Sequence, residues 1–130
     1  MDLVLHSNGD HVSLINIAER QDISKNYLEQ VFSTLRKAGI VKSVKGAQGG
    51  YILADQASDI LVGDILRALE GSLSVVGERA ETETNKIENC IKVNVWNQID
   101  KKINEVIDNL YLEDLINEYK KDVNSIMYYI

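Results

Sequence analysis

The sequence predicts a mostly α-helical fold with a small β-hairpin and a long C-terminal helix. Two short amphipathic segments are separated by a polar turn between Ser13 and Gly39, and two β-prone segments flank a glycine-rich turn at 45–50. A long apolar stripe then runs from Ile87 to Leu110. With 130 residues, 45% of them hydrophobic, the chain can bury a core. We expect one compact domain with an appended helical arm.

Two helices joined by a tight turn are predicted in the first amphipathic part. Ser13 is a good N-cap for the first helix, and Asp22 belongs to the polar pair that ends it. Ser24 caps the second helix, where apolar residues recur at three- and four-residue spacing until Gly39 provides a stop. This spacing is typical of a helix-turn-helix, whose second helix presents its N-terminal residues to the DNA major groove.

A β-hairpin is predicted next, with strands at 40–44 and 51–54. The turn between them contains Gly46, Gly49 and Gly50, beside Lys45. Glycine permits the positive φ and the close backbone approach that a DNA-contacting wing tip needs, although the simpler interpretation is that these are turn residues without a ligand. The fold class is therefore a winged helix-turn-helix plus a long C-terminal dimerisation helix.

The remaining chain divides into three parts. A helix from Val62 ends at Gly71 and completes the predicted DNA-binding domain, residues 1–71; an acidic loop follows at 72–86. Residues 87–130 are predicted to form the dimerisation helix and a tail, in which a short helix at roughly 112–119 folds back. The winged domain is too small to cover the long stripe, so pairing with a second copy is the economical solution. The expected dimer-interface residues are Ile91, Val95, Trp96, Ile99, Ile103, Val106 and Leu110.

The charge distribution decides whether DNA binding is reasonable for so acidic a chain. The net charge is −6 and the pI is near 4.9, but residues 1–51 hold six lysines and arginines against five acids. Between Lys25 and Lys45 only Glu29 is acidic, among five basic residues. Positive charge is thus concentrated in a region that could bind a phosphate backbone. The acidic part of the chain after residue 51 should face away from DNA.

The DNA-contacting residues are predicted from this basic region. We expect Ser24, Lys25 and Tyr27 to contact mostly phosphates, and Glu29 and Gln30 to read bases. The alternative for this run is a cap followed by a solvated helix face. Further expected contacts come from Arg36, Lys42, Lys45 and the wing glycines Gly46, Gly49 and Gly50.

The chain carries YLEQ at 27–30, LRKAG at 35–39, GGY at 49–51 and VGDI at 62–65. Together these motifs resemble the Rrf2 family of winged-helix regulators, which includes IscR and CymR. The resemblance implies that residues preceding Met1 are missing, so that the first helix is truncated. It also implies that cluster-bearing members use three cysteines and a histidine in the region before Trp96; Cys90 matches one cysteine, but Val93 occupies the histidine position. We therefore expect no iron–sulfur cluster and no metal.

The resemblance is greatest to the cluster-free, CymR-like branch, because the chain ends in a similar IMYYI tail. In that branch the repressor acts with cysteine synthase, and an amino-acid pocket of that enzyme could capture the Tyr129–Ile130 end. Cys90 is interpreted first as a small apolar residue of the stripe, with redox sensing as the alternative.

These observations predict a cytoplasmic, non-enzymatic transcription regulator, since no secretion signal, membrane segment or catalytic constellation is present. We expect a homodimeric repressor of sulfur, cysteine or iron–sulfur genes, bound to a pseudo-palindromic operator. The alternative is a winged-helix protein-interaction module that binds DNA weakly or not at all.

Overall fold

The computed structural model describes residues 1–47, 49–70 and 85–128. Three helices come first, α1 (Asp2–Ser7), α2 (Leu14–Gln21) and α3 (Lys25–Lys37), followed by strands β1 (Val41–Val44) and β2 (Gly50–Leu53). A 3-10 turn η1 (Ala57–Asp59) leads to α4 (Val62–Glu70). The C-terminal part comprises α5 (Lys86–Ile91), a π-helical turn η2 (Lys92–Trp96), α6 (Asn97–Ile107) and α7 (Leu112–Tyr128).

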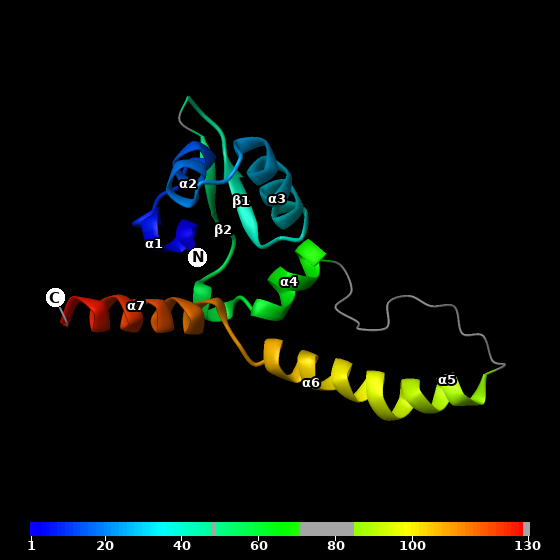
Figure 1. The fold of residues 1–130 in the computed structure, drawn as a ribbon. Helices are drawn as coiled ribbons and strands as arrows, with labels where there is room; N and C mark the ends of the chain where they lie inside the picture. The colour runs from blue at the N-terminus through cyan, green and yellow to red at the C-terminus, as the bar shows by residue number, and fades with distance from the viewer. Residues whose placement is uncertain (48, 71–84, 129–130) are drawn as a thin grey trace.

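Residues 1–70, which we call the head, stand above two helical extensions in Figure 1. The segment α5–η2–α6, which we call the arm, leads away on one side, and α7 leads away on the other. One buried apolar cluster holds the head to the start of α7. Its members are Leu3, Val12, Leu14, Ile17, Leu28, Phe32, Leu35, Ile40, Val41, Ile60, Leu112 and Ile116.

The helix-turn-helix follows from local hydrogen bonding, as predicted. Ser13 Oγ accepts from the Asn16 amide at the start of α2, and Ser24 Oγ accepts from the Tyr27 amide at the start of α3. Between them Asp22 adopts a left-handed conformation with φ 52°, and its N–H donates to the Ala18 carbonyl. The chain therefore leaves α2 and enters α3 within three residues of irregular backbone.

The hairpin is antiparallel, with Val41 opposite Leu53 and Val44 opposite Gly50. Its strands are shifted by about one residue from the predicted ranges. Val12 adds a short bridge on the other side of β2, where Val12 and Tyr51 exchange two backbone hydrogen bonds of 2.9 Å. The base of the wing is thus fixed to the segment that precedes α2.

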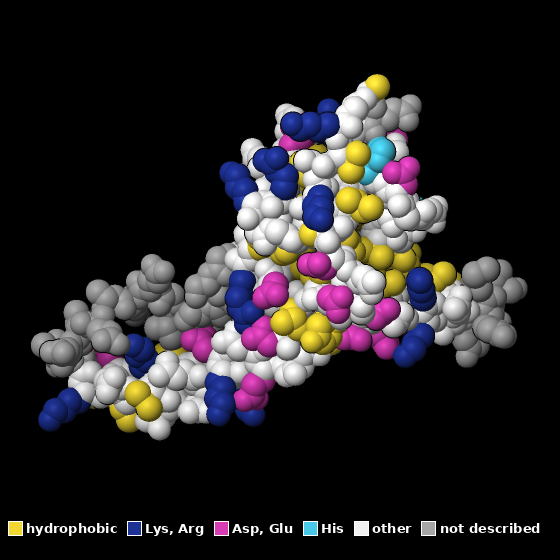
Figure 2. All heavy atoms as spheres, turned by 180° about the vertical axis from the view of Figure 1, so that it is seen from behind, with side chains coloured by type: hydrophobic (Ala, Val, Ile, Leu, Met, Phe, Trp, Pro, Cys, Tyr) yellow, Lys and Arg dark blue, Asp and Glu magenta, His cyan; other side chains and the backbone are white. Residues whose placement is uncertain are grey.

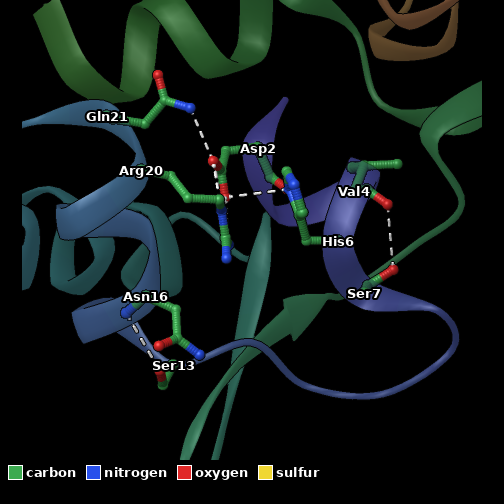
Figure 3. A network of polar contacts seen from close by, with 8 residues as sticks. All are labelled: Asp2, Val4, His6, Ser7, Ser13, Asn16, Arg20 and Gln21. Atoms are coloured by element: carbon green, nitrogen blue, oxygen red, sulfur yellow. Dashed lines mark hydrogen bonds and ion pairs between the residues drawn. The ribbon is translucent and has the colours of Figure 1, made fainter.

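An ion-pair network fixes α1 to the end of α2 (Figure 3). Asp2 accepts from Arg20 Nη2 at 2.7 Å and from Gln21 Nε2 at 2.7 Å, while His6 approaches the same carboxylate at 3.6 Å. The hydrogen bond from Arg20 holds the pKa of Asp2 below its ordinary value. Leu3, one residue along, is buried in the core.

The C-terminal helices differ from the predicted ones in two ways. The arm contains the π turn η2, where the Asn97 N–H donates to the Lys92 carbonyl five residues earlier. The last helix extends to Tyr128, not to residue 119, because its apolar spacing continues through Tyr119, Val123 and Ile126 without a glycine or proline to stop it.

The head and the α6–α7 junction are joined by backbone hydrogen bonds of 2.8 Å, from Val62 to the Leu110 carbonyl and from Leu112 to the Ile60 carbonyl. In the described part of the chain, no helix is both long and apolar enough to cross a membrane. Most of the predicted acidic loop lies outside the described residues, as do Tyr129 and Ile130. At the end of that loop, Asn85 caps α5 through Oδ1, and Lys86 is already helical.

Candidate DNA interface

Helix α3 has an apolar inner face and a polar outer face. Leu28, Phe32 and Leu35 are buried against the head's core. On the opposite side, six polar side chains line a shallow open hollow, and we call this set the outer face: Asn26, Glu29, Gln30, Ser33, Thr34 and Lys37. Because the core holds the inner face, the outer face is presented at a fixed angle to any partner.

The structure therefore places Glu29 and Gln30 together on the outer face, beside four residues that were not predicted to contact DNA. Asn26, Ser33 and Lys37 follow the three- and four-residue spacing of one helix face, and Thr34 lies beside them. That spacing was the available signal. The predicted base contacts were confined to the start of the helix, where helix-turn-helix proteins make their N-terminal contacts, and Arg36 was the one contact predicted from its last turn.

The first turn of α3 is also accessible. The Tyr27 side chain is 59% exposed, and Ser24 is exposed although its hydroxyl caps the helix. Lys25 Nζ lies 3.7 Å from Glu29 Oε1, with about half of each side chain exposed. Such a surface pair contributes little to stability, so a phosphate group can draw Lys25 away from Glu29 at small cost.

Basic side chains gather on the side of the head that α3 occupies (Figure 2), while acidic side chains lie nearer the two helical extensions. Arg36 on α3, Lys42 on β1 and Lys45 at the wing tip are all exposed. The structure thus supports the charge separation that the sequence predicts, with positive charge on the face available to a phosphate backbone.

Glycine is required at the three wing positions for different structural reasons. Gly46 has a φ of +146°, and a Cβ there would meet nothing within 4 Å, so its backbone conformation is what requires glycine. A Cβ on Gly50 would instead overlap the Val12 carbonyl, and one on Gly49 would come within 2.8 Å of the Val44 carbonyl oxygen. Gly49 and Gly50 therefore allow close packing at the base of the wing.

An aromatic contact fixes the wing relative to α3. The rings of Phe32 and Tyr51 have centroids 5.0 Å apart and planes inclined by 51°. This tilted arrangement is favourable for aromatic pairs. Phe32 lies on the inner face of α3 and Tyr51 on β2, so the two elements that could touch DNA are packed against each other.

The predicted dimer residues lie on the arm, except Leu110, which follows α6 and whose carbonyl accepts a hydrogen bond from Val62 of the head. Ile91, Val95, Trp96, Ile99 and Val106 are exposed, whereas Ile103 and Leu110 are half-buried. Cys90 is also exposed in the single chain, where Asn94 Nδ2 approaches its sulfur at 3.5 Å.

The residues of one chain do not fit an iron–sulfur cluster. Cys90 is the single cysteine of the sequence, whereas such clusters need several thiolate or imidazole ligands. Within the described ranges, no group of three or more histidine, cysteine, aspartate or glutamate side chains could hold a metal ion.

Comparisons with known proteins agree with this geometry. Residues 1–118 match the Rrf2 family, described as an iron-dependent transcriptional regulator. The transcriptional regulator IscR of Pectobacterium atrosepticum is 37% identical over 117 residues, which cover 90% of this chain and 71% of that protein.

Solved structures give the same result. The global cysteine regulator CymR of B. subtilis is similar with a TM-score of 0.73 and 38% identity, over 90% of this chain and 86% of that one. IscR of T. potens is similar with a TM-score of 0.71 and 45% identity, over 93% of this chain and 80% of that one.

Proposed function

The chain belongs to the Rrf2 family of transcriptional regulators, and on that premise we propose that it is a homodimeric repressor that binds a pseudo-palindromic DNA operator. Like its relatives, it is a transcriptional regulator and not an enzyme. The observation that carries the proposal is the outer face of α3, which is polar and exposed beside the basic residues of the wing. A helix of this kind, packed on a rigid core, fits the major groove.

Each part of the surface has a distinct role in the proposal. Gln30 and Glu29 read base edges, since glutamine pairs with adenine and glutamate accepts from cytosine. Lys25, Arg36, Lys42 and Lys45 bind phosphates, and Ser24 and Tyr27 add neutral backbone contacts. Among the wing glycines, Gly46 lets the hairpin tip approach the duplex closely, and Gly49 and Gly50 hold the base of the hairpin in the position that this approach needs.

The homodimer is proposed from the arm. Ile87 is 73% exposed and Val106 is 59% exposed, and the apolar side chains between them lie on the same helix. An exposed apolar face of this length on a small protein marks an interaction site. A second copy related by a two-fold axis covers both faces at once and presents two reading helices to two half-sites.

The regulated genes are proposed to concern sulfur, cysteine or iron–sulfur metabolism, because one similar structure is named a global cysteine regulator. We propose that no iron–sulfur cluster is held by this chain, given its single cysteine. DNA as the partner places the protein in the cytoplasm. Cysteine synthase is a proposed partner through Tyr129 and Ile130; deletion of Ile130 should abolish a complex with that enzyme, and an unchanged complex would rule this contact out.

The decisive experiment measures binding to the chain's own promoter fragment across a salt series. The parent is compared with a variant carrying Lys25→Ala and Lys45→Ala, and with a charge-matched control carrying Lys120→Ala and Lys121→Ala on α7. We expect the first variant to bind more weakly with a salt slope reduced by about two, because each lost phosphate contact lowers the slope by about one. The control should behave as the parent does.

Two other outcomes would change the conclusion. Equal losses in the two double variants would mean that only net charge matters, and the assigned surface would be wrong. A parent that shows no preference for the promoter over a scrambled fragment would favour the protein-interaction module, which the net charge of −6 would suit.

A further inference from the structure

Apolar side chains on the arm recur every four residues, at Ile87, Ile91, Val95, Ile99 and Ile103. In an α-helix each residue turns the chain by about 100°, so a four-residue step exceeds one full turn by about 40°. Four such steps would carry the line of side chains about 160° around the helix. In an uninterrupted α-helix, one partner could not cover both ends of this line.

The π turn η2 lies in the middle of this series. The Asn97 N–H bonds to the carbonyl of Lys92, five residues earlier instead of four. Because the wide turn takes up one extra residue, it sets every later residue back by about 100°. Ile103 then lies about 60° from Ile87 instead of about 160°, and Val106 returns to the line of Ile87. All these side chains fall within the width of one ordinary apolar face.

The aligned face, which we call the stripe, comprises Ile87, Ile91, Val95, Ile99, Ile103 and Val106. Five of its six members are exposed, and Ile103 is half-buried. The head lies on a different side of α6, where Arg67 Nη2 of α4 donates to Asn104 Oδ1 at 2.8 Å. The stripe is therefore left uncovered by the head.

The side chain of Asn94 lies within the wide turn. Its Nδ2 donates to the Cys90 carbonyl at 2.8 Å, one turn earlier. A side-chain donor of this kind can satisfy a carbonyl where the regular ladder of backbone hydrogen bonds changes. The wide turn is thus accompanied by its own polar contact.

We propose that η2 is a register device, whose wide turn absorbs one residue and so straightens the stripe, which can then pair along its whole length with the stripe of a second copy. The inference rests on the proposed homodimer. From Ile87 to Val106 the stripe spans about 28 Å of helix, so a partner must offer a straight apolar face of the same length. A two-fold related copy offers that face by construction.

Deletion of Asn94 removes the extra residue and tests the device. We expect the arm to become a continuous α-helix, with helicity by circular dichroism equal to or above that of the parent. In a regular helix that is one residue shorter, Ile99, Ile103 and Val106 keep the same angles relative to Ile87, so the stripe should stay aligned. The homodimer dissociation constant, measured by sedimentation equilibrium, should therefore stay near the parental value. A deletion variant that keeps parental helicity while its dissociation constant rises at least tenfold would refute the register device.

Two further variants distinguish an effect of the helical register from a loss of folding and from an error in the proposed dimer interface. Inserting one alanine after Gln98 in the deletion variant restores the number of residues between Ile91 and Ile99, but in a regular helix it turns the later part of the stripe by about 100°. The dissociation constant should then rise at least tenfold. If this variant has parental helicity and still dimerises as tightly as the parent, the register device is wrong. Ile99→Glu tests the stripe itself: a dimer unchanged by this charge would show that the stripe is not the dimer interface, whereas a parent chain that does not dimerise would overturn the proposed homodimer.

Discussion

The guanidinium of Arg67 on α4 forms a bidentate ion pair with the carboxylate of Asp108, the residue that follows α6. Nη1 lies 2.7 Å from Oδ1 and Nη2 lies 2.8 Å from Oδ2. Gly63 lies directly beneath this pair, and a Cβ there would collide with both side chains. The ion pair therefore connects the DNA-binding head to the arm, and any change in the angle between them must alter this contact.

Arg67→Lys should loosen the head from the arm. A lysine cannot form the two parallel hydrogen bonds, although it keeps the charge. We expect the amides of Val62 and Leu112, which bond across this junction, to exchange hydrogen about 3- to 10-fold faster, while the α3 amides stay unchanged. Lys102→Ala is the control, because it removes an ion pair within α6, 3.3 Å from Glu105. Equal acceleration in the control would show that the connection is not specific.

The same pair predicts acid sensitivity. The hydrogen bond from Arg67 holds the pKa of Asp108 below its ordinary value of 3.8. A carboxyl whose pKa is lowered in the folded state stabilises the fold fully at pH values above its pKa in the unfolded state. This stabilisation is lost as the pH falls through its lower pKa in the folded state. Asp108→Asn should therefore reduce the dependence of the melting temperature on pH below about 4. Since the pKa of Asp2 is lowered in the same way by Arg20, Asp2→Asn should remove a separate part of the dependence. If neither variant changes the slope, these pairs do not govern acid stability.

The helix-turn-helix and the hairpin could be predicted because their signals are local. Ser13 and Ser24 are caps, and the glycines mark a turn, so each element is specified within a few residues. The ion pair of Arg67 with Asp108 joins residues 41 positions apart, and no local pattern indicates such a contact. The π turn was missed for a related reason, since an apolar series with four-residue spacing suits both a drifting α-helix and a straightened one.

Gly50→Ala should destabilise the head by about 1–3 kcal/mol, because the added Cβ would overlap the Val12 carbonyl, which accepts a hydrogen bond from the Tyr51 amide. The measurement is urea unfolding followed by circular dichroism. Lys45→Ala, in the exposed turn of the same hairpin, should change the free energy of unfolding by less than about 0.5 kcal/mol. A Gly50→Ala variant as stable as the parent would mean that the Val12 bridge moves freely, and that glycine is required here for another reason.

The outer face of α3 should contain two kinds of residue with separable effects on DNA binding. Gln30→Ala should reduce discrimination between the operator and a single-base variant by about 1–3 kcal/mol at one position, while the salt slope stays constant. Lys37→Ala should weaken binding to every sequence alike and lower the salt slope by about one, because a lysine near the end of the helix can reach only the backbone. Both are measured by fluorescence anisotropy at several salt concentrations. If Gln30→Ala weakened all sequences equally, the amide would be contacting a phosphate, and base reading would have to be reassigned to neighbours on the same face, Asn26 or Ser33.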